Sequence, residues 1–337
     1  MTLRLLLVHA HPDDETLTHG ATVAAALAHG HEVDLVTCTR GEEGEVIGDA
    51  EQHRTSHRDD TLAELREAEL AAALDALAAG TGGRVAHTYL DGLPAAAGTR
   101  RQADRYRDSG MVVLPGGRAA VPPDVRPDCF AVADLDEAAA RLAGLVRRRR
   151  PHVVLTYGPH GGYGHPDHVM AHRVTLRALD LAADTATDTD GAADAAPAKA
   201  AAWTVPWVYG AAADADALRS WLRHRADPAA WDPDGPLPHL FVPPADIDAT
   251  VRAGAWLASK AAALRALPSQ ATVLDDAPGS AALALSNDVP QPLTGDEAGQ
   301  LLRPVAPAAE PLALAVDDPL RALLLPAGTR PAAPPHG

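Results

Sequence analysis

The sequence predicts an α/β protein with a doubly wound and mostly parallel sheet, followed by a smaller C-terminal α/β lobe. Two observations lead to this prediction. Short apolar runs of strand length alternate with longer segments in which leucine and alanine recur at helical spacing. In addition, the order strand, helix, strand repeats along the first half of the chain, which is typical of parallel sheets with crossover helices.

The individual elements follow from these patterns. The segment 57–78 is assigned as a helix because Leu62, Leu70 and Leu77 lie near helical spacing. Residues 91–133 are rich in Gly, Pro and Arg, and a long excursion of this kind in a compact domain usually carries function. The other expected elements are strands at 3–8, 32–37, 84–89, 153–156 and 203–209, and helices at 18–29, 134–149, from about 167, at 214–225 and at 248–266.

Composition divides the chain into four parts. The segment 181–202 is almost entirely Ala, Asp and Thr, which bury too little apolar area to offset the entropy of ordering, so we expect a flexible insertion. Before it lies a larger domain, residues 1–180. After it, residues 203–302 are expected to form a smaller lobe, and the Pro- and Ala-rich tail, 303–337, to fray.

Charge and cysteine content exclude several partners. The formal net charge of −16 argues against nucleic acid or an anionic membrane as a partner, because both require a basic face. Cys38 and Cys129 alone do not make a disulfide framework. No charged and apolar leader opens the chain, and no apolar run approaches membrane-spanning length. We therefore expect a cytoplasmic protein, with its oligomeric state left open.

Two clusters of ligand-type side chains follow predicted strands. The first strand runs into His9-Ala-His11-Pro12-Asp13-Asp14-Glu15, and the strand at 153–156 runs into a segment that ends in His165-Pro166-Asp167-His168. The carboxyl edge of a parallel sheet is where open α/β proteins build their sites. The two clusters can therefore face one crevice.

A hydrolytic zinc site needs three His or carboxylate ligands and an open position for water. One His and one Asp of the first turn, with a His of the second, meet this need, and Asp13 then becomes a candidate general base. A single histidine is more often a polar loop residue, but two matched His-Pro-Asp turns favour a metal. We expect His9 to pack within its strand. The remaining histidines of the first sixty residues are assigned to the surface or to helix caps: His19, His29, His31, His53 and His57.

At these residues the chain resembles a known family. The strings HAHPDDE (9–15) and GYGHPDH (162–168) are similar to those of the LmbE-like or PIG-L N-acetylglucosaminyl deacetylases, zinc enzymes with a Rossmann-like fold. The strings VTCTRGEEGEVIGD (36–49), RDSGM (107–111) and ALSND (284–288) resemble the members of that family that act in mycothiol biosynthesis. The resemblance runs from about residue 3 to 290 and is interrupted by the segment 181–202.

The resemblance implies a catalytic set. It assigns His11, Asp14 and His168 as ligands of one zinc ion, although ferrous iron also suits such a set. Asp13 would be the general base. His165, protonated, and the hydroxyl of Tyr163 would stabilise the oxyanion. The reaction would then be hydrolysis of an acetamide. Residues 1–180 would be the Rossmann-like, metal-binding catalytic domain, and the lobe 203–302 would complete the substrate pocket.

Substrate contacts are implied for four residues: Arg66, Asp108, Glu45 and Asn287. For two of them other roles stay open, because Arg66 could form an ion pair with Glu69 along the helix and Asp108 could cap a loop. The chain departs from the family at Leu267-Pro268-Ser269-Gln270, where the family commonly has a His before its Ser/Thr-Gln pair, so a role for that position is in doubt.

The implied substrate is a small acetylated amino sugar linked to inositol, and the implied products are acetate and the free amine. One rival is the related mycothiol S-conjugate amidase, although the string GEEGEV rather than GERGE favours the deacetylase. A second rival is a sugar-binding protein that has lost turnover, against which Asp13 and His165 argue. A metallophosphoesterase needs more ligands on separate strands than the chain offers.

Overall fold

A computed structural model describes residues 1–95, 105–113, 119–184, 201–224, 232–276, 280–285, 290–303 and 314–324. The helices are α1 (Asp14–Ala28), α2 (Leu62–Ala78), α3 (Leu135–Arg149), α4 (Pro166–Ala183), α5 (Ala215–His224) and α6 (Leu257–Arg265). The strands are β1 (Arg4–His9), β2 (Glu32–Thr37), β3 (Val85–Tyr89), β4 (Val112–Val113), β5 (Ala119–Ala120), β6 (Val153–Tyr157), β7 (Trp207–Asp214), β8 (Phe241–Val242), β9 (Ala249–Arg252), β10 (Ala271–Asp276), β11 (Ser280–Leu285), β12 (Pro290–Pro292) and β13 (Asp296–Leu301).

The central sheet confirms the predicted α/β class. Its strand order is β3-β2-β1-β6-β7-β13-β9, with β8 paired to β7. In this sheet the pairs β3–β2, β2–β1, β1–β6, β6–β7 and β7–β8 are parallel. Strand β13 runs antiparallel to both β7 and β9. The chain order reverses between β1 and β6, and this switch point is where a doubly wound sheet opens a crevice at its carboxyl edge.

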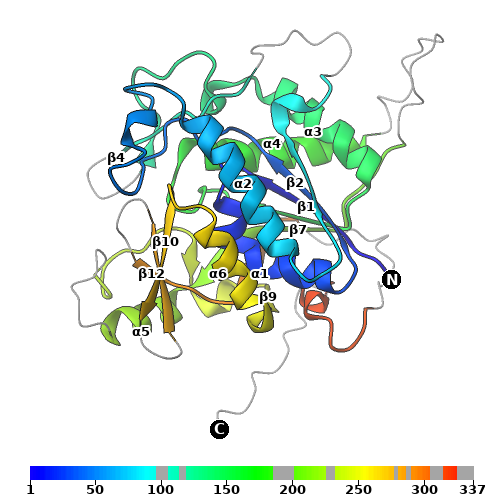
Figure 1. Cartoon of the computed structure of the whole chain (residues 1–337). Helices are drawn as coiled ribbons and strands as arrows, with labels where there is room; N and C mark the ends of the chain where they lie inside the picture. The colour runs from blue at the N-terminus through cyan, green and yellow to red at the C-terminus, as the bar shows by residue number, and fades with distance from the viewer. Residues whose placement is uncertain are drawn as a thin grey trace, which may run out of the picture.

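Helices cover both faces of this sheet (Figure 1). In β1, Leu5 and Leu7 belong to one apolar core and Leu6 and Val8 to another, as the alternation of side chains along a strand requires. The first core includes residues of α1, α2 and α6, and the second includes residues of α3 and α4. The parallel strands are thus buried on both sides, which accounts for their continuous apolar sequences.

The C-terminal half extends the same sheet. The segment 203–302, expected to be a C-terminal lobe, contributes β7, β8, β9 and β13 to the central sheet. Strands β10, β11 and β12 of the same segment form a separate three-stranded antiparallel sheet. The helix expected at 248–266 is shorter than predicted, because its first part is β9. Thr250 and Val251 are β-branched and fit the strand, which pairs with β13.

Part of the expected frayed tail packs against the core. A 3-10 turn, η7 (Pro319–Leu324), buries Leu320 and Leu323 in the first core. His31 Nε2 lies within hydrogen-bond distance of Asp318 Oδ2, at 2.8 Å, and both side chains are buried. This segment has apolar residues that the Pro- and Ala-rich average of the tail concealed.

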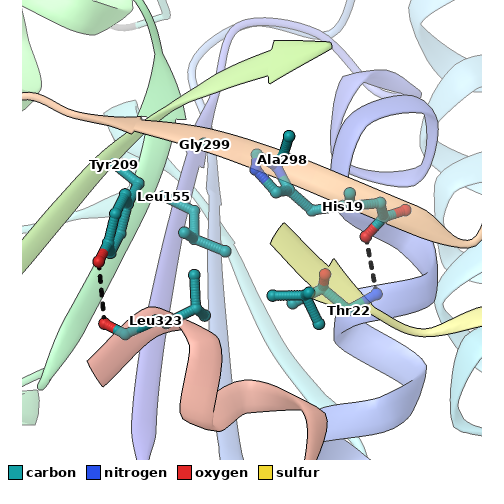
Figure 2. A pocket seen from close by; sticks show the side chains of 9 residues that line it. His19, Thr22, Leu155, Tyr209, Ala298, Gly299 and Leu323 are labelled. Atoms are coloured by element: carbon teal, nitrogen blue, oxygen red, sulfur yellow. Dashed lines mark hydrogen bonds between the residues drawn. The ribbon is translucent and has the colours of Figure 1, made fainter. Parts of the chain in front are cut away.

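A small hollow lies beneath α1, lined by residues of α1, β6, β7, β9, β13 and η7 (Figure 2). On one side the Tyr209 hydroxyl donates to the Leu323 carbonyl at 3.1 Å, and on the other the Thr22 N–H donates to Glu297 at 2.8 Å. Its volume of about 10 Å³ is near the minimum for one water. None of the predicted site residues lines it.

In the described part of the chain, no helix has the length and apolar composition needed to cross a membrane.

Candidate metal centre

The two His-Pro-Asp turns meet at the switch point. β1 ends at His9 and leads through the first turn into α1, and the second turn leads into α4. β1 and β6 are neighbouring parallel strands, with Leu5 opposite Val153. Both turns therefore lie at the same edge of the sheet, as the sequence predicts.

Donor atoms of the three predicted ligands lie around one point. His11 Nδ1 is 3.2 Å from His168 Nε2 and 3.4 Å from Asp14 Oδ2, and His168 Nε2 is 3.4 Å from Asp14 Oδ1. Zinc bound at 2.0–2.1 Å in a tetrahedral site separates its ligand atoms by about 3.3 Å. The two Asp14 distances end on different carboxylate oxygens, but the spacing of the three residues, here called the donor triangle, fits one zinc-sized cation.

Hydrogen bonds to the far sides of both rings leave the inward nitrogens free to bind a cation. His11 Nε2 is 3.2 Å from Asp167 Oδ2, and His168 Nδ1 is 3.2 Å from the Gly161 carbonyl. Because these oxygens only accept, each far nitrogen carries the proton. His11 Nδ1 and His168 Nε2 then present lone pairs, which is the arrangement typical of metal-binding histidines.

Charge around His11 also favours a cation. Burial alone would lower the pKa of His11, but Asp108, Asp14 and Asp167 raise it well above its usual value. The buried cluster therefore stabilises positive charge. Two further groups of donor atoms lie within 4.8 Å of one another, His11 with His165 and His168, and His11 with Asp108 and Asp167. In the second of these, Asp167 already accepts hydrogen bonds from the N–H and hydroxyl of Ser109.

Asp13 stands beside the donor triangle in a strained conformation. Its φ of 138° is one that L-residues rarely adopt. The Arg66 guanidinium donates to Asp13 Oδ2 at 3.1 Å, to the Pro12 carbonyl at 2.6 Å and to the Gly41 carbonyl at 3.0 Å. Burial raises the pKa of the Asp13 carboxyl to about 8, although Arg66 acts in the opposite direction.

His165 and Tyr163 line the same centre. The His165 ring centroid is 4.6 Å from that of His11, and the Tyr163 centroid is 5.2 Å from that of His168. His165 Nδ1 accepts the Asp167 N–H, so Nδ1 carries no proton. Burial, with the nearby His11 and His168, holds the pKa of His165 well below its usual value. The protonated state that we expected is therefore disfavoured, and a neutral ring with its proton on Nε2 replaces it.

The residues expected to bind substrate are distributed differently. Arg66 and Asp108 are buried and contact protein groups: Arg66 holds Asp13, and Asp108 Oδ1 lies 3.4 Å from His11 Nε2. The Arg66 guanidinium thus points to the first turn, while Glu69 accepts hydrogen bonds from Ser269. Glu45 is exposed. Asn287 lies outside the described residues.

Three contacts around the ligands were not predicted. The Tyr157 hydroxyl donates to Asp14, Asp167 lies behind His11, and Ser109 holds Asp167. Asp167 belongs to the second His-Pro-Asp turn, so the need of a ligand histidine for a carboxylate partner was the signal available for it. Ser109 belongs to the RDSGM string of the long excursion, but no pattern in the sequence connects it to Asp167.

Ser269 and Gln270, which follow the doubtful position, form a corner that holds the loop of the GEEGEV string. Gln270 Nε2 donates to the Glu45 carbonyl at 2.9 Å, and the Ile47 N–H donates to the Ser269 carbonyl at 2.9 Å. Together with the two bonds from Ser269 to Glu69, these contacts connect the loop to α2. In this chain the corner therefore has a structural role.

Comparisons with known proteins identify the family of this chain. A model of the PIG-L family, described as GlcNAc-PI de-N-acetylase, matches residues 6–179. Three relatives carry the name 1D-myo-inositol 2-acetamido-2-deoxy-alpha-D-glucopyranoside deacetylase. The protein of Kribbella flavida is 42% identical over 90% of this chain and 93% of its own length. The protein of Kineococcus radiotolerans is 44% identical over 90% and 78%, and that of Streptomyces avermitilis 43% over 89% and 92%. With the family model covering both His-Pro-Asp turns and the relatives nearly the whole chain, this protein belongs to the PIG-L family of de-N-acetylases.

Proposed function

We propose that this protein hydrolyses the acetamide of 1-O-(2-acetamido-2-deoxy-α-D-glucopyranosyl)-D-myo-inositol to acetate and the free amine, as a step of mycothiol biosynthesis. The names of the three relatives supply the substrate. The observation that carries the chemistry is the triangle of donor atoms from His11, Asp14 and His168, with sides of 3.2–3.4 Å. Its mixed nitrogen and oxygen donors suit a hydrolytic metal site.

We propose zinc as the metal, one ion per subunit, held by these three residues. Ferrous iron accepts the same donors and is the second candidate. The bound ion would supply Lewis-acid activation of a water and of the amide carbonyl. The protein's own groups supply the proton transfers and the remaining charge stabilisation.

Asp13 is the proposed general base. Its carboxylate accepts a proton from the attacking water and returns it to the departing amine, so that the proton count balances over the reaction. Arg66 keeps this carboxylate in place through Asp13 Oδ2 and the Pro12 carbonyl. A fixed base beside the reacting water avoids the cost of orienting it during the reaction.

His165 and Tyr163 are the proposed partners of the oxyanion. The neutral His165 ring donates from Nε2, and the hydroxyl of Tyr163, two residues earlier in the same turn, is the second donor. Tyr163 is 43% exposed, so its side chain is accessible to an arriving substrate. Glu45, exposed on the neighbouring loop, and Asn287 remain candidate contacts for the sugar or inositol hydroxyls, whereas we reassign Arg66 and Asp108 to holding Asp13 and His11.

Acetate release from the acetylated glucosaminyl-inositol tests the proposal. Treatment with a chelator should abolish release, and returning Zn²⁺ or Fe²⁺ separately should identify the active metal. Asp13→Asn should keep its metal and lose about 10²–10⁴-fold in kcat, the usual contribution of a general base. Asp59→Asn, an identical change at an exposed position, should match the wild type.

A mycothiol S-conjugate is assayed beside the acetylated sugar. Preferential cleavage of the conjugate would assign the protein to the amidase reaction instead. Full activity of Asp13→Asn would remove Asp13 from the mechanism while leaving the substrate assignment intact.

A further inference from the structure

We infer that Tyr157 is a positioning residue that leaves one chosen oxygen of Asp14, Oδ1, for the metal. Tyr157 is the last residue of β6 and is buried beneath the donor triangle. Its hydroxyl oxygen lies 2.6 Å from Asp14 Oδ2 and 2.8 Å from the backbone nitrogen of Ala10. This inference rests on the proposed metal-dependent function, because it concerns how that metal is held.

The direction of both hydrogen bonds is determined by proton count. The Ala10 N–H can only donate, so the Tyr157 oxygen accepts from it. A phenol has a single proton, and with the oxygen accepting from Ala10 that proton is directed at the carboxylate. Tyr157 therefore donates to Asp14 Oδ2.

The two oxygens of Asp14 are consequently unequal. Oδ2 accepts from the His11 backbone N–H at 2.9 Å as well as from Tyr157. Distance alone does not separate the oxygens, since Oδ2 is 3.4 Å from His11 Nδ1 and Oδ1 is 3.4 Å from His168 Nε2. Among the described residues, however, no N–H or O–H group donates to Oδ1. The lone pairs available to a cation are those of Oδ1.

The Tyr157 ring also restrains the second histidine ligand. It is stacked on His168 with centroids 4.2 Å apart and an interplanar angle of 13°. On its other side it meets His9 edge-on at 5.1 Å. The ring has little freedom to rotate, so its hydroxyl stays on Asp14.

Binding through one oxygen has a consequence for the reaction. A carboxylate that binds through both oxygens occupies two coordination positions, whereas Oδ1 alone occupies one. A hydrolytic site needs free positions for water and for the amide carbonyl. By holding Oδ2 away from the metal, Tyr157 keeps such a position available.

Tyr157→Phe tests this role, because it keeps the ring and removes only the hydroxyl. We expect the variant to bind zinc about 10–100-fold more weakly in competition with a chelator, as is typical for the loss of a group that orients a ligand. The Co²⁺-substituted variant should differ from wild type in its visible absorption, because its carboxylate is free to bind through both oxygens.

Tyr209→Phe is the matched control. Tyr209 lies on the neighbouring strand β7, is equally buried, and donates to the Leu323 carbonyl away from the metal centre. A purely structural effect of losing a buried phenol would lower stability in both variants. Only Tyr157→Phe should alter zinc affinity and the Co²⁺ spectrum.

The zinc-loaded wild-type enzyme supplies a measurement that needs no variant. A crystal structure should place Asp14 Oδ1 about 2.0–2.2 Å from zinc, with Oδ2 beyond bonding distance. Coordination through Oδ2 or through both oxygens overturns the inference, as does wild-type zinc affinity with an unchanged Co²⁺ spectrum in a folded Tyr157→Phe protein. Failure of the wild type to bind zinc and release acetate would instead reject the proposed function.

Discussion

Arg66 shows how one buried side chain supports a strained neighbour. Backbone strain of the kind seen at Asp13 costs about 1–3 kcal/mol and persists only where surrounding contacts enforce it. The three hydrogen bonds of Arg66 to the first turn and to the Gly41 carbonyl are such contacts. Gly41 itself approaches Arg66 so closely that a Cβ atom there would lie 1.9 Å from Nη1.

Gly41→Ala should therefore displace Arg66 and with it Asp13. We expect kcat to fall by about 10²-fold, the loss that a misplacement of roughly 1 Å can cause, with the metal content unchanged. Steady-state kinetics of the metal-loaded variant, with metal analysis of the same sample, provide the measurement.

Gly48→Ala is the control for backbone strain. Gly41 and Gly48 have φ values of +69° and +78°, but nothing lies within 4 Å of a Cβ atom at Gly48. Both variants should lose stability, and only Gly41→Ala should lose turnover. Equal losses of turnover in the two would show that Arg66 does not transmit the effect.

At the residue scale, the sequence indicated the proposed metal ligands more directly than the residues that hold the site in place. His11, Asp14 and His168 were recognisable because the two turns repeat one pattern after strands. Arg66 and Asp108 were expected to contact substrate, and the structure shows both buried against protein groups. No local pattern tells whether a side chain of a distant segment faces a ligand or a protein group.

At the scale of elements, the burial of η7 is not what the composition of the surrounding tail predicts. Leu320 is completely buried although it belongs to a tail rich in Pro and Ala. The turn lies against β9 and α1, and Tyr209 donates to its Leu323 carbonyl. The end of the described chain thus closes one side of the first core.

Leu320→Ala should destabilise the protein by about 2–5 kcal/mol, as is usual when a buried leucine is truncated. The measurement is the free energy of unfolding from urea titration. Val316→Ala, in the same segment but at a residue that is 89% exposed, should change it by less than about 0.5 kcal/mol. A small effect of Leu320→Ala would mean that the turn detaches from the core in solution.

Element prediction succeeded where periodicity was strong and failed where it was mixed. The β2 strand and the end of α2 agree with the predicted positions. The stretch before α6 was assigned to a helix from its alanines, but Val251 faces the core and its partner strand comes from the distant segment 296–301. A pairing of that kind is decided by tertiary contacts, which outweigh local propensity.

For the whole molecule, buried histidines make stability depend on pH. His19, expected at the surface, is buried at 4% exposure between α1 and the sheet, and it contacts His9. Burial, with the nearby Lys260, lowers the pKa of His19 from 6.5 to about 3. Below pH 6.5, His19 is therefore protonated in the unfolded chain but stays neutral in the folded protein.

The stabilising contribution of the neutral His19 is fully present above pH 6.5 and is lost as the pH falls towards 3. Between pH 7 and pH 5 this loss of unfolding free energy amounts to about 2 kcal/mol. His19→Asn should reduce the loss of unfolding free energy over this interval by that amount, measured by urea titration of the metal-free protein.

His53→Asn, at an exposed histidine, should leave the pH dependence as it is in the wild type. An unchanged pH dependence in His19→Asn as well would show that His19 is hydrated or protonated in the folded state.

The proposed ligands come from segments that follow two neighbouring strands, and this placement would connect metal retention to the kinetics of unfolding. His11 and His168 are 157 residues apart in the chain and meet only because β1 pairs with β6. A half-folded chain has no complete site, so an ion would bind only after β1 and β6 have paired and would not initiate folding. An ion held by both turns would link them, so β1 and β6 could not separate without breaking a bond to it. Bound metal should accordingly slow the opening of the sheet, and the rate at which a chelator removes it should follow local breathing at the β1–β6 edge.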